Sequence, residues 1–242
     1  MSLLRHKPEG EEIPVVVLHP KQWNQRVVLW AHESGKAGLY GPEGQPTPAV
    51  LALLQSGAAV VGADLLYQGE FLADGKPLAA ARRVDNPREF AGYTLGYNAS
   101  LFAQRVHDLL SLVSFCQTYA NAKPQVDLIG FGVAGAWAAA ARAQAGPAIA
   151  RAAIDTEGFR FAKLPSITDL NFLPGGAKYG DLPGMLALAA PGELWLAGEG
   201  PLPPGLLSAA YTAAGASGKL QLFTGPADQK TAAAVQWLAR QP

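Results

Sequence analysis

Two kinds of hydrophobic pattern alternate along the chain. Runs that are apolar at nearly every position occupy 26–31 and 58–63, and such runs are typical of parallel strands that helices cover on both faces. The segment 126–131 continues the alternation as a further strand. Further strand patterns lie at 13–18, 150–154, 193–197 and 220–223, and residues 2–6 can pair with the first of these as a hairpin across 7–10. Apolar residues at helical spacing fill segments between them, at 46–56, 100–120, 133–145, 182–190, 205–214 and 227–240. The pattern therefore predicts an α/β fold with eight strands, mostly parallel, and helices on both faces of the sheet.

A sharp turn from strand to helix is expected at 126–135, where glycines stand at 130, 132 and 135. In α/β-hydrolases a turn of this kind, the nucleophile elbow, carries the motif G-x-S-x-G, and its serine attacks the substrate. Gly132 occupies the serine position, so the segment resembles such an elbow without its hydroxyl. We expect Gly132 at the apex of the turn after the fifth strand.

The positions of the histidines also argue against a catalytic triad. All four lie in the first half of the chain, at His6, His19, His32 and His107. An α/β-hydrolase takes its base from a loop after the last strand, in the chain order serine, acid, histidine. No histidine follows His107. The chain therefore lacks both the nucleophile and the base at the expected positions.

Several polar residues follow the strands and are expected at one edge of the sheet, where open α/β folds bind ligands. The loop after the third strand carries His32, Ser34 and Lys36, and with the Val133 N–H it stands where hydrolases form an oxyanion hole. The acid position of the triad falls to Glu199, or failing it to Asp155 or Glu157. The residues that we expect to bind a ligand are His32, Lys36, Asp64, Tyr67, Glu70 and Val133.

Three alternatives compete with this interpretation of the edge. The loop at 32–38 can be a tight hydrated turn that needs glycine for its geometry alone. Ser34 can serve as a displaced nucleophile beside His32, although a spacing of two residues in a loop does not control the geometry. The carboxylates near His32 can bind a divalent cation, but carboxylates at loop starts are common helix caps and no metal motif is present, so we expect neither a metal nor a cofactor.

Two long polar segments, 68–98 and 158–180, interrupt the alternation and are rich in glycine and proline. Loops of this length in a compact domain are usually functional. Both leave the carboxyl ends of strands, so we expect them over the same edge of the sheet, with no separate lid domain.

Composition narrows the class of protein. The 242 residues are 49% hydrophobic and fit one domain, and 19 basic residues balance 19 acidic ones, which argues against binding to nucleic acid or an anionic membrane. A charged start at 1–12 and the lack of long apolar runs predict a soluble chain without an export signal. Cys116, the single cysteine, falls on the apolar face of a predicted helix, so we expect it to be buried and unreactive.

Together these segments resemble one family, the α/β-hydrolase-fold region toward the C-terminal end of bacterial acetyl-xylan-esterase-like proteins. The resemblance covers nearly the whole chain from residue 14 onward and implies a carbohydrate-esterase lineage, in which glycine is also frequent at the elbow. It implies no catalytic triad in this chain, because no serine stands at the nucleophile position and no histidine at the base position. The segments that carry it are 30–32, 35–36, 69–71, 89–94, 97–98, 104–108, 130–135, 155–161 and 171–180.

The function expected from the sequence is therefore a non-catalytic or weakly catalytic hydrolase-fold protein that binds a small molecule or a saccharide. A carboxylesterase or acetylesterase with a nonstandard nucleophile, or with a catalytic partner domain, is the second hypothesis. The third is a structural or interaction module, which would expose a large apolar patch and pair with another chain or a second copy of itself.

Overall fold

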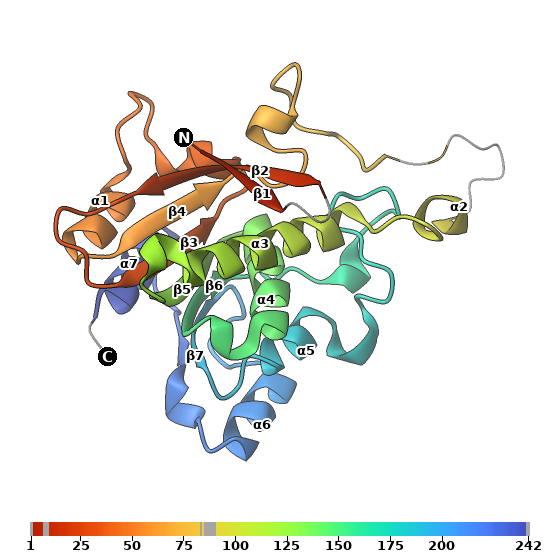
Figure 1. Cartoon of the computed structure of the whole chain (residues 1–242). Coiled ribbons are helices and arrows are strands. Elements are labelled where there is room, and N and C mark those ends of the chain that lie inside the picture. Colours follow the sequence, from red (N-terminus) through yellow and green to blue (C-terminus); the bar gives the residue numbers. More distant parts are fainter. Residues whose placement is uncertain (1, 7–9, 83, 85–90, 241–242) are drawn as a thin grey trace.

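The computed structural model describes residues 2–6, 10–82, 84 and 91–240, and it is built around one eight-stranded sheet (Figure 1). The strands lie in the order β1-β2-β4-β3-β5-β6-β7-β8. Pairing is antiparallel between β1 and β2 and between β2 and β4, and parallel from β4 through β8. Their bounds are β1 Ser2–His6, β2 Glu11–Leu18, β3 Arg26–Ala31, β4 Ala59–Ala63, β5 Gln125–Gly130, β6 Arg151–Asp155, β7 Glu193–Ala197 and β8 Leu220–Leu222. The predicted mostly parallel sheet is confirmed.

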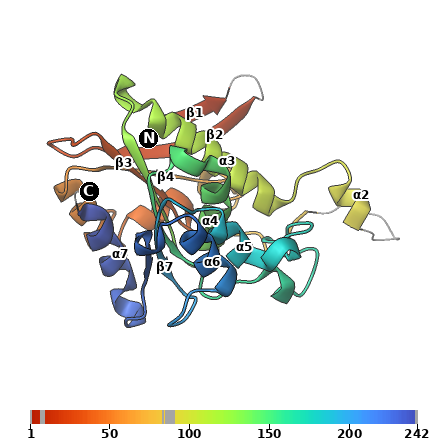
Figure 2. The ribbon, with the colours of Figure 1, turned by 90° about the horizontal axis from the view of Figure 1, so that it is seen from below.

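Helices cover both faces of the sheet (Figure 2), as the uniformly apolar strands predict. On one face α1 (Pro48–Gln55) packs beside α7 (Lys230–Ala239). On the other face lie α3 (Leu101–Gln117), α4 (Val133–Ala145), α5 (Asp181–Ala187) and α6 (Gly205–Ala213), each packed on the next. Alternate residues of β3 serve the two cores: Val27 and Leu29 face α3 and α4, whereas Val28 and Trp30 face α1 and α7.

Capping residues set the helix starts. The Thr47 hydroxyl accepts a hydrogen bond from the Val50 N–H at 3.3 Å and begins α1, and Ser100 caps α3 through the Ala103 N–H in the same way. Cys116 is buried on α3, and burial raises the pKa of its thiol. No helix in the described part of the chain is long and apolar enough to cross a membrane.

A buried ion cluster lies at the amino ends of the central strands. Asp127 on β5 pairs with Arg26 of β3 at 2.5 Å and with Arg151 of β6 at 2.8 Å. Both guanidinium groups also donate to the Leu238 carbonyl at the end of α7, and Arg151 reaches the Arg240 carbonyl at 3.0 Å. Positive charge at a helix C-terminus is favourable, so the cluster fixes α7 to the sheet.

The two long polar segments are tied to each other and to the helices. The Ala81 N–H donates to the Thr168 carbonyl at 2.8 Å, and the Trp137 indole on α4 donates to the Asn171 side chain at 3.0 Å. The first segment contains a short helix that the sequence pattern did not predict, α2 (Ala91–Leu95), and the part of that segment at 83 and 85–90 lies outside the described residues.

Candidate functional site

The elbow has the geometry that its glycines predict. Gly132 caps α4 directly after β5, with φ +60° and ψ −131°, a conformation that side chains other than glycine rarely adopt. A Cβ at Gly130 would lie 2.7 Å from the Ala134 carbonyl, and one at Gly135 would collide with the Asp155 carbonyl. These glycines allow α4 to start close against β5 and β6. The prediction that Gly132 forms the apex of the turn is confirmed.

A carboxylate lies beside that apex. A Cβ added at Gly132 would be 3.4 Å from Oε2 of Glu157, so the Glu157 side chain borders the space into which a serine hydroxyl would extend. Glu157 itself has a strained φ of +47°, and its backbone N–H is held by Asp155 at 3.0 Å. The sequence marks Glu157 as a candidate acid after the sixth strand, but it does not predict this position over the elbow.

The other two candidate acids are paired with cations of the same chain. Asp155 is almost fully buried and bonds Nζ of Lys230, the first residue of α7, at 2.5 Å. Glu199 bonds Arg160 through both oxygens, at 2.5 and 3.0 Å, and this pairing raises the pKa of Arg160. In a hydrolase of this fold an acid in this region would orient a histidine. Here the charges of both acids are already balanced.

A second ion cluster joins the loops after β3 and β4. The Lys36 ammonium pairs with Asp64 and, at 2.5 Å, with Glu70, and the backbone N–H groups of Lys36 and Glu70 donate to the Asp64 carboxylate. Burial lowers the pKa of Lys36, but the hydrogen bonds to both carboxylates outweigh this effect and raise it. Three residues expected to bind a ligand therefore bind one another.

His32 does not belong to this ion cluster. Its ring packs against the backbone of Gly38, where a Cβ would collide with the imidazole. The Ser34 N–H donates to its Nδ1 at 3.0 Å, so the neutral ring carries its proton on Nε2. Burial lowers the pKa of His32 against a smaller opposing effect of Glu33, which leaves the ring neutral at neutral pH. The Ser34 side chain is exposed and its hydroxyl makes no hydrogen bond within the described residues.

A cavity of about 910 Å³, which we call the elbow pocket, opens above Gly132 between α1 and α7. Its wall contains aromatic rings, the neutral His32 and three carboxylates, with no lysine or arginine among the described lining residues. The N-termini of α1, α4 and α7 all begin at this cavity. The residues used below are Trp30, His32, Glu33, Phe131, Glu157 and Asp228. Of the residues that the sequence assigns to ligand binding or catalysis, the pocket contains His32, Glu157 and Gly132.

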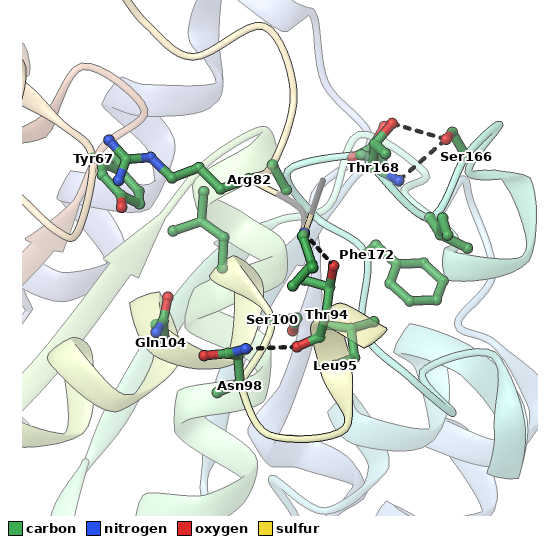
Figure 3. A pocket seen from close by; sticks show the side chains of 16 residues that line it. Tyr67, Arg82, Thr94, Leu95, Asn98, Ser100, Gln104, Ser166, Thr168 and Phe172 are labelled. Atoms are coloured by element: carbon green, nitrogen blue, oxygen red, sulfur yellow. Dashed lines mark hydrogen bonds between the residues drawn. The ribbon is translucent and has the colours of Figure 1, made fainter. Parts of the chain in front are cut away.

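The two long polar segments do not line the elbow pocket. They enclose a second cavity, of about 470 Å³, on the α3 side (Figure 3). Tyr67, expected near His32, lies in this second cavity, where the Arg82 guanidinium stands 4.9 Å from its ring centre. In Figure 3 the Thr94 carbonyl accepts a hydrogen bond from Asn98, at 2.7 Å. The sequence predicts both segments over the carboxyl edge of the sheet, but their described residues line this second cavity and not the elbow pocket, and a hydrogen bond from Ala81 to Thr168 joins them there.

Helix α3 holds the loop that carries Tyr67. Arg105 donates to the Leu66 carbonyl at 3.1 Å, and the Asp108 carboxylate accepts from the Leu66 N–H at 2.8 Å. Burial lowers the pKa of Arg105 to about 10 and raises that of Asp108 to about 6. His107 lies at the surface beside Glu11, 3.0 Å from its carboxylate, in a local pair.

No group of three or more potential metal ligands comes together among the described residues. Four of the carboxylates that the sequence places near one another, Asp64, Glu70, Asp155 and Glu199, are paired with lysine or arginine side chains instead. The residues that sequence reasoning missed are the cations that pair with the last two, Lys230 and Arg160. The only signal for Lys230 is its position shortly after the last strand, where a hydrolase would have histidine.

Comparisons with known proteins show which solved structures this chain is similar to. No family model and no curated relative matches the chain. The solved structure of Est1E from Butyrivibrio proteoclasticus, with bound ferulic acid, is similar over 98% of both chains, at a TM-score of 0.61 and 11% identity. An esterase from Pyrococcus furiosus is similar over 98% of this chain and 88% of its own, at 0.58 and 14%.

A putative acetyl xylan esterase from Bacteroides fragilis is similar over 86% of this chain and 62% of its own, with a TM-score of 0.58 and 16% identity. Identities this low establish the architecture alone. The chain has the α/β-hydrolase fold, as its resemblance to acetyl-xylan-esterase-like proteins implies.

Proposed function

We propose that this α/β-hydrolase-fold protein binds a small ligand in the elbow pocket and performs no serine-type ester hydrolysis. The observation that carries the proposal is the pair formed by Gly132 and Glu157: the elbow offers no hydroxyl, and a carboxylate borders the space where one would extend. The pocket itself is open and large enough for a small molecule or a short saccharide.

Electrostatics support the proposal. Ester hydrolysis through an oxyanion hole needs hydrogen-bond donors around the oxygen that becomes negative. The expected donors are the Val133 N–H and the loop at 32–36, but the Glu157 carboxylate beside Gly132 would repel that oxyanion. The other two candidate acids do not orient a histidine, because Asp155 holds Lys230 and Glu199 holds Arg160.

The neighbouring structures support a carbohydrate-esterase lineage. Est1E is described with ferulic acid, and two further neighbours are an esterase and a putative acetyl xylan esterase. A lineage of this kind would explain why the elbow and its pocket persist around Gly132. A catalytic partner domain or a second copy of the chain remains compatible with this role.

One observation favours slow hydrolysis as a second function. His32 is neutral and lines the elbow pocket. Its unprotonated nitrogen, Nδ1, accepts the Ser34 N–H, so the ring can take a proton from a water that attacks an activated ester once that hydrogen bond opens. Hydrolases stripped of triad members retain about 10³–10⁴-fold acceleration over water. Slow turnover of an activated ester would therefore not establish an evolved esterase.

The test treats the wild-type chain with a fluorophosphonate probe and measures hydrolysis of p-nitrophenyl acetate beside a His32→Gln variant. We expect no labelling, because the probe needs a serine activated by a base. Any residual hydrolysis should fall in the variant, which identifies it as imidazole chemistry. Stoichiometric labelling, mapped to Ser34 or to another serine, would overturn the proposal.

A further inference from the structure

We propose that the elbow pocket selects ligands in which a protonated amine adjoins an aromatic or apolar body. The inference rests on the proposed binding function and names the chemical class of its ligand. It follows from the charges and rings that line the pocket, and it separates this chain from proteins that bind carboxylate products.

The charges that face the cavity are of one sign. Glu33, Glu157 and Asp228 line the pocket, and all three are carboxylates exposed to solvent. His32, the remaining titratable residue among the lining residues, is neutral because burial lowers its pKa. A bound anion would therefore meet three negative charges.

The cations nearest in the chain do not offset them. Lys230 adjoins the pocket residue Thr231, but its ammonium is bonded to Asp155 at 2.5 Å. Lys36 belongs to the same loop as His32 and is bonded to both Asp64 and Glu70. Arg160 follows Glu157 and is bonded to Glu199. Each of these cations is balanced within the protein, so the pocket keeps its negative potential.

The helix N-termini that meet at the cavity have a weaker effect of opposite sign. Each helix terminus acts as about half a positive charge, spread over its first turn. Three of them reduce the potential of three carboxylates but do not cancel it. The Glu157 carboxylate borders Gly132, the N-cap of α4, where a negative charge is favourable.

The apolar part of the wall suits a flat ligand. The rings of Trp30 and Phe131 meet edge to face, with centres 6.2 Å apart, and Val235 and Ala52 continue the same apolar wall. An aromatic body can pack on this wall while its ammonium group lies near the carboxylates. Ring faces also attract cations, which adds to the same preference.

The experiment compares three probes of nearly equal shape: tyramine, which is cationic, tyrosol, which is neutral, and 4-hydroxyphenylacetate, which is anionic. Calorimetry gives the affinities, and the amide signals of Gly132 and Gly38 in nuclear magnetic resonance spectra locate the binding. We expect tyramine to bind about fivefold more tightly than tyrosol at low salt, the size of a good exposed ion pair, and the anion to bind most weakly. The preference should shrink as salt is added.

Variants assign the effect to the pocket. Glu157→Gln and Asp228→Asn should each lower the affinity for tyramine and leave that for tyrosol unchanged. Asp74→Asn, an equal change of charge at an exposed residue outside the pocket, should alter neither. Tyrosol binding at Gly132 as tightly as tyramine would overturn the inference and leave the proposed function standing. If tyramine does not perturb Gly132 or Gly38 at all, the inference is wrong, whereas the fluorophosphonate test judges the absence of serine hydrolysis independently.

Discussion

Gly132 combines two properties that a serine at this position could not combine without cost. Its φ of +60° places α4 against the sheet, and its missing side chain leaves room for the Glu157 carboxylate. The position is therefore informative in two ways: the backbone keeps the shape of an elbow, and the side chains around it no longer form a triad.

Replacing Gly132 with serine should lower the free energy of unfolding by about 1–2 kcal/mol, because a residue with a Cβ is strained at this φ and ψ. The closest contact of the new Cβ, 3.4 Å to Glu157, is an ordinary one, so the fold should survive. Urea denaturation measures the change, and Gly132→Ala is the matched control, since it adds the same strain without a hydroxyl. If Gly132→Ser lowers the free energy of unfolding much more than Gly132→Ala does, the hydroxyl is not accommodated beside Glu157.

Adding a base should change the chemistry. Lys230→His introduces an imidazole at the position whose side chain now forms an ion pair with Asp155. We expect the combination of Gly132→Ser and Lys230→His to hydrolyse p-nitrophenyl acetate faster than either single variant and to react with a fluorophosphonate, because nucleophile and base act as a unit. A folded double variant that stays at the rate of Gly132→Ser would show that residue 230 does not reach the elbow.

At the level of elements, α3 holds the loop after β4 with two buried charges of opposite sign, Arg105 and Asp108. Asp108 accepts from the Leu66 N–H, yet burial raises its pKa to about 6 from an ordinary value of 3.8. The folded protein therefore binds the Asp108 proton more tightly than the unfolded chain does. The stability that this carboxyl contributes is fully present below about pH 4 and is lost as the pH rises through 6.

Asp108→Asn keeps the acceptor for the Leu66 N–H and removes the titration. The difference in unfolding free energy, wild type minus variant, should fall by about 2 kcal/mol between pH 4 and pH 7, since about two pKa units separate the two states. Urea denaturation across this range measures it. Glu11, His107 and Arg105, the charged neighbours of Asp108, are the same in both proteins. A difference that is flat or rises with pH would contradict the prediction.

The sequence predicts the elements well because their signal is local. Each of the eight strands lies within two residues of its expected bounds, and the central strands β3, β4, β5 and β6 are largely apolar runs buried on both faces. The helix α2 is the exception, because it belongs to a polar segment without hydrophobic periodicity. Gly132 was also predictable, because the turn after a buried strand has a recognisable glycine pattern.

The candidate site could be predicted only in part. His32 lies at the elbow pocket as expected, and Glu157 lies there in a position that the sequence does not predict. Lys36, Asp64 and Glu70 pair with one another, and Tyr67 lies in the second cavity. The pairing of these residues depends on which cation approaches which carboxylate in the folded structure. Arg160 and Glu199, 39 residues apart, meet through the packing of β6 beside β7, and no spacing rule in the sequence predicts that meeting.

At the level of the whole molecule, the two edges of the sheet have different roles. The carboxyl edge carries the elbow pocket and its ion pairs, and the amino edge carries the cluster of Asp127, Arg26 and Arg151. Helix α7 connects them: Thr231, Val235 and Ala239 line the pocket along the length of the helix, and the Leu238 carbonyl in its last turn is held by both arginines. Its ten residues span about 15 Å.

This arrangement makes ligand binding and the docking of α7 thermodynamically reciprocal. If the docking of α7 on the two arginines raises the affinity of the pocket for its ligand, ligand binding must stabilise that docking by the same free energy, because coupling free energies are symmetric. Asp127→Asn leaves two buried cations without a counter-charge, so it should lower the unfolding free energy by about 3 kcal/mol and weaken tyramine binding at the far end of the sheet. Saturating tyramine should, in turn, slow amide hydrogen exchange in the last turn of α7. Unchanged exchange in the last turn of α7 would show that the ion cluster and the elbow pocket are energetically independent. Slower exchange would show that a cluster without any contact to the ligand contributes to the affinity of the pocket.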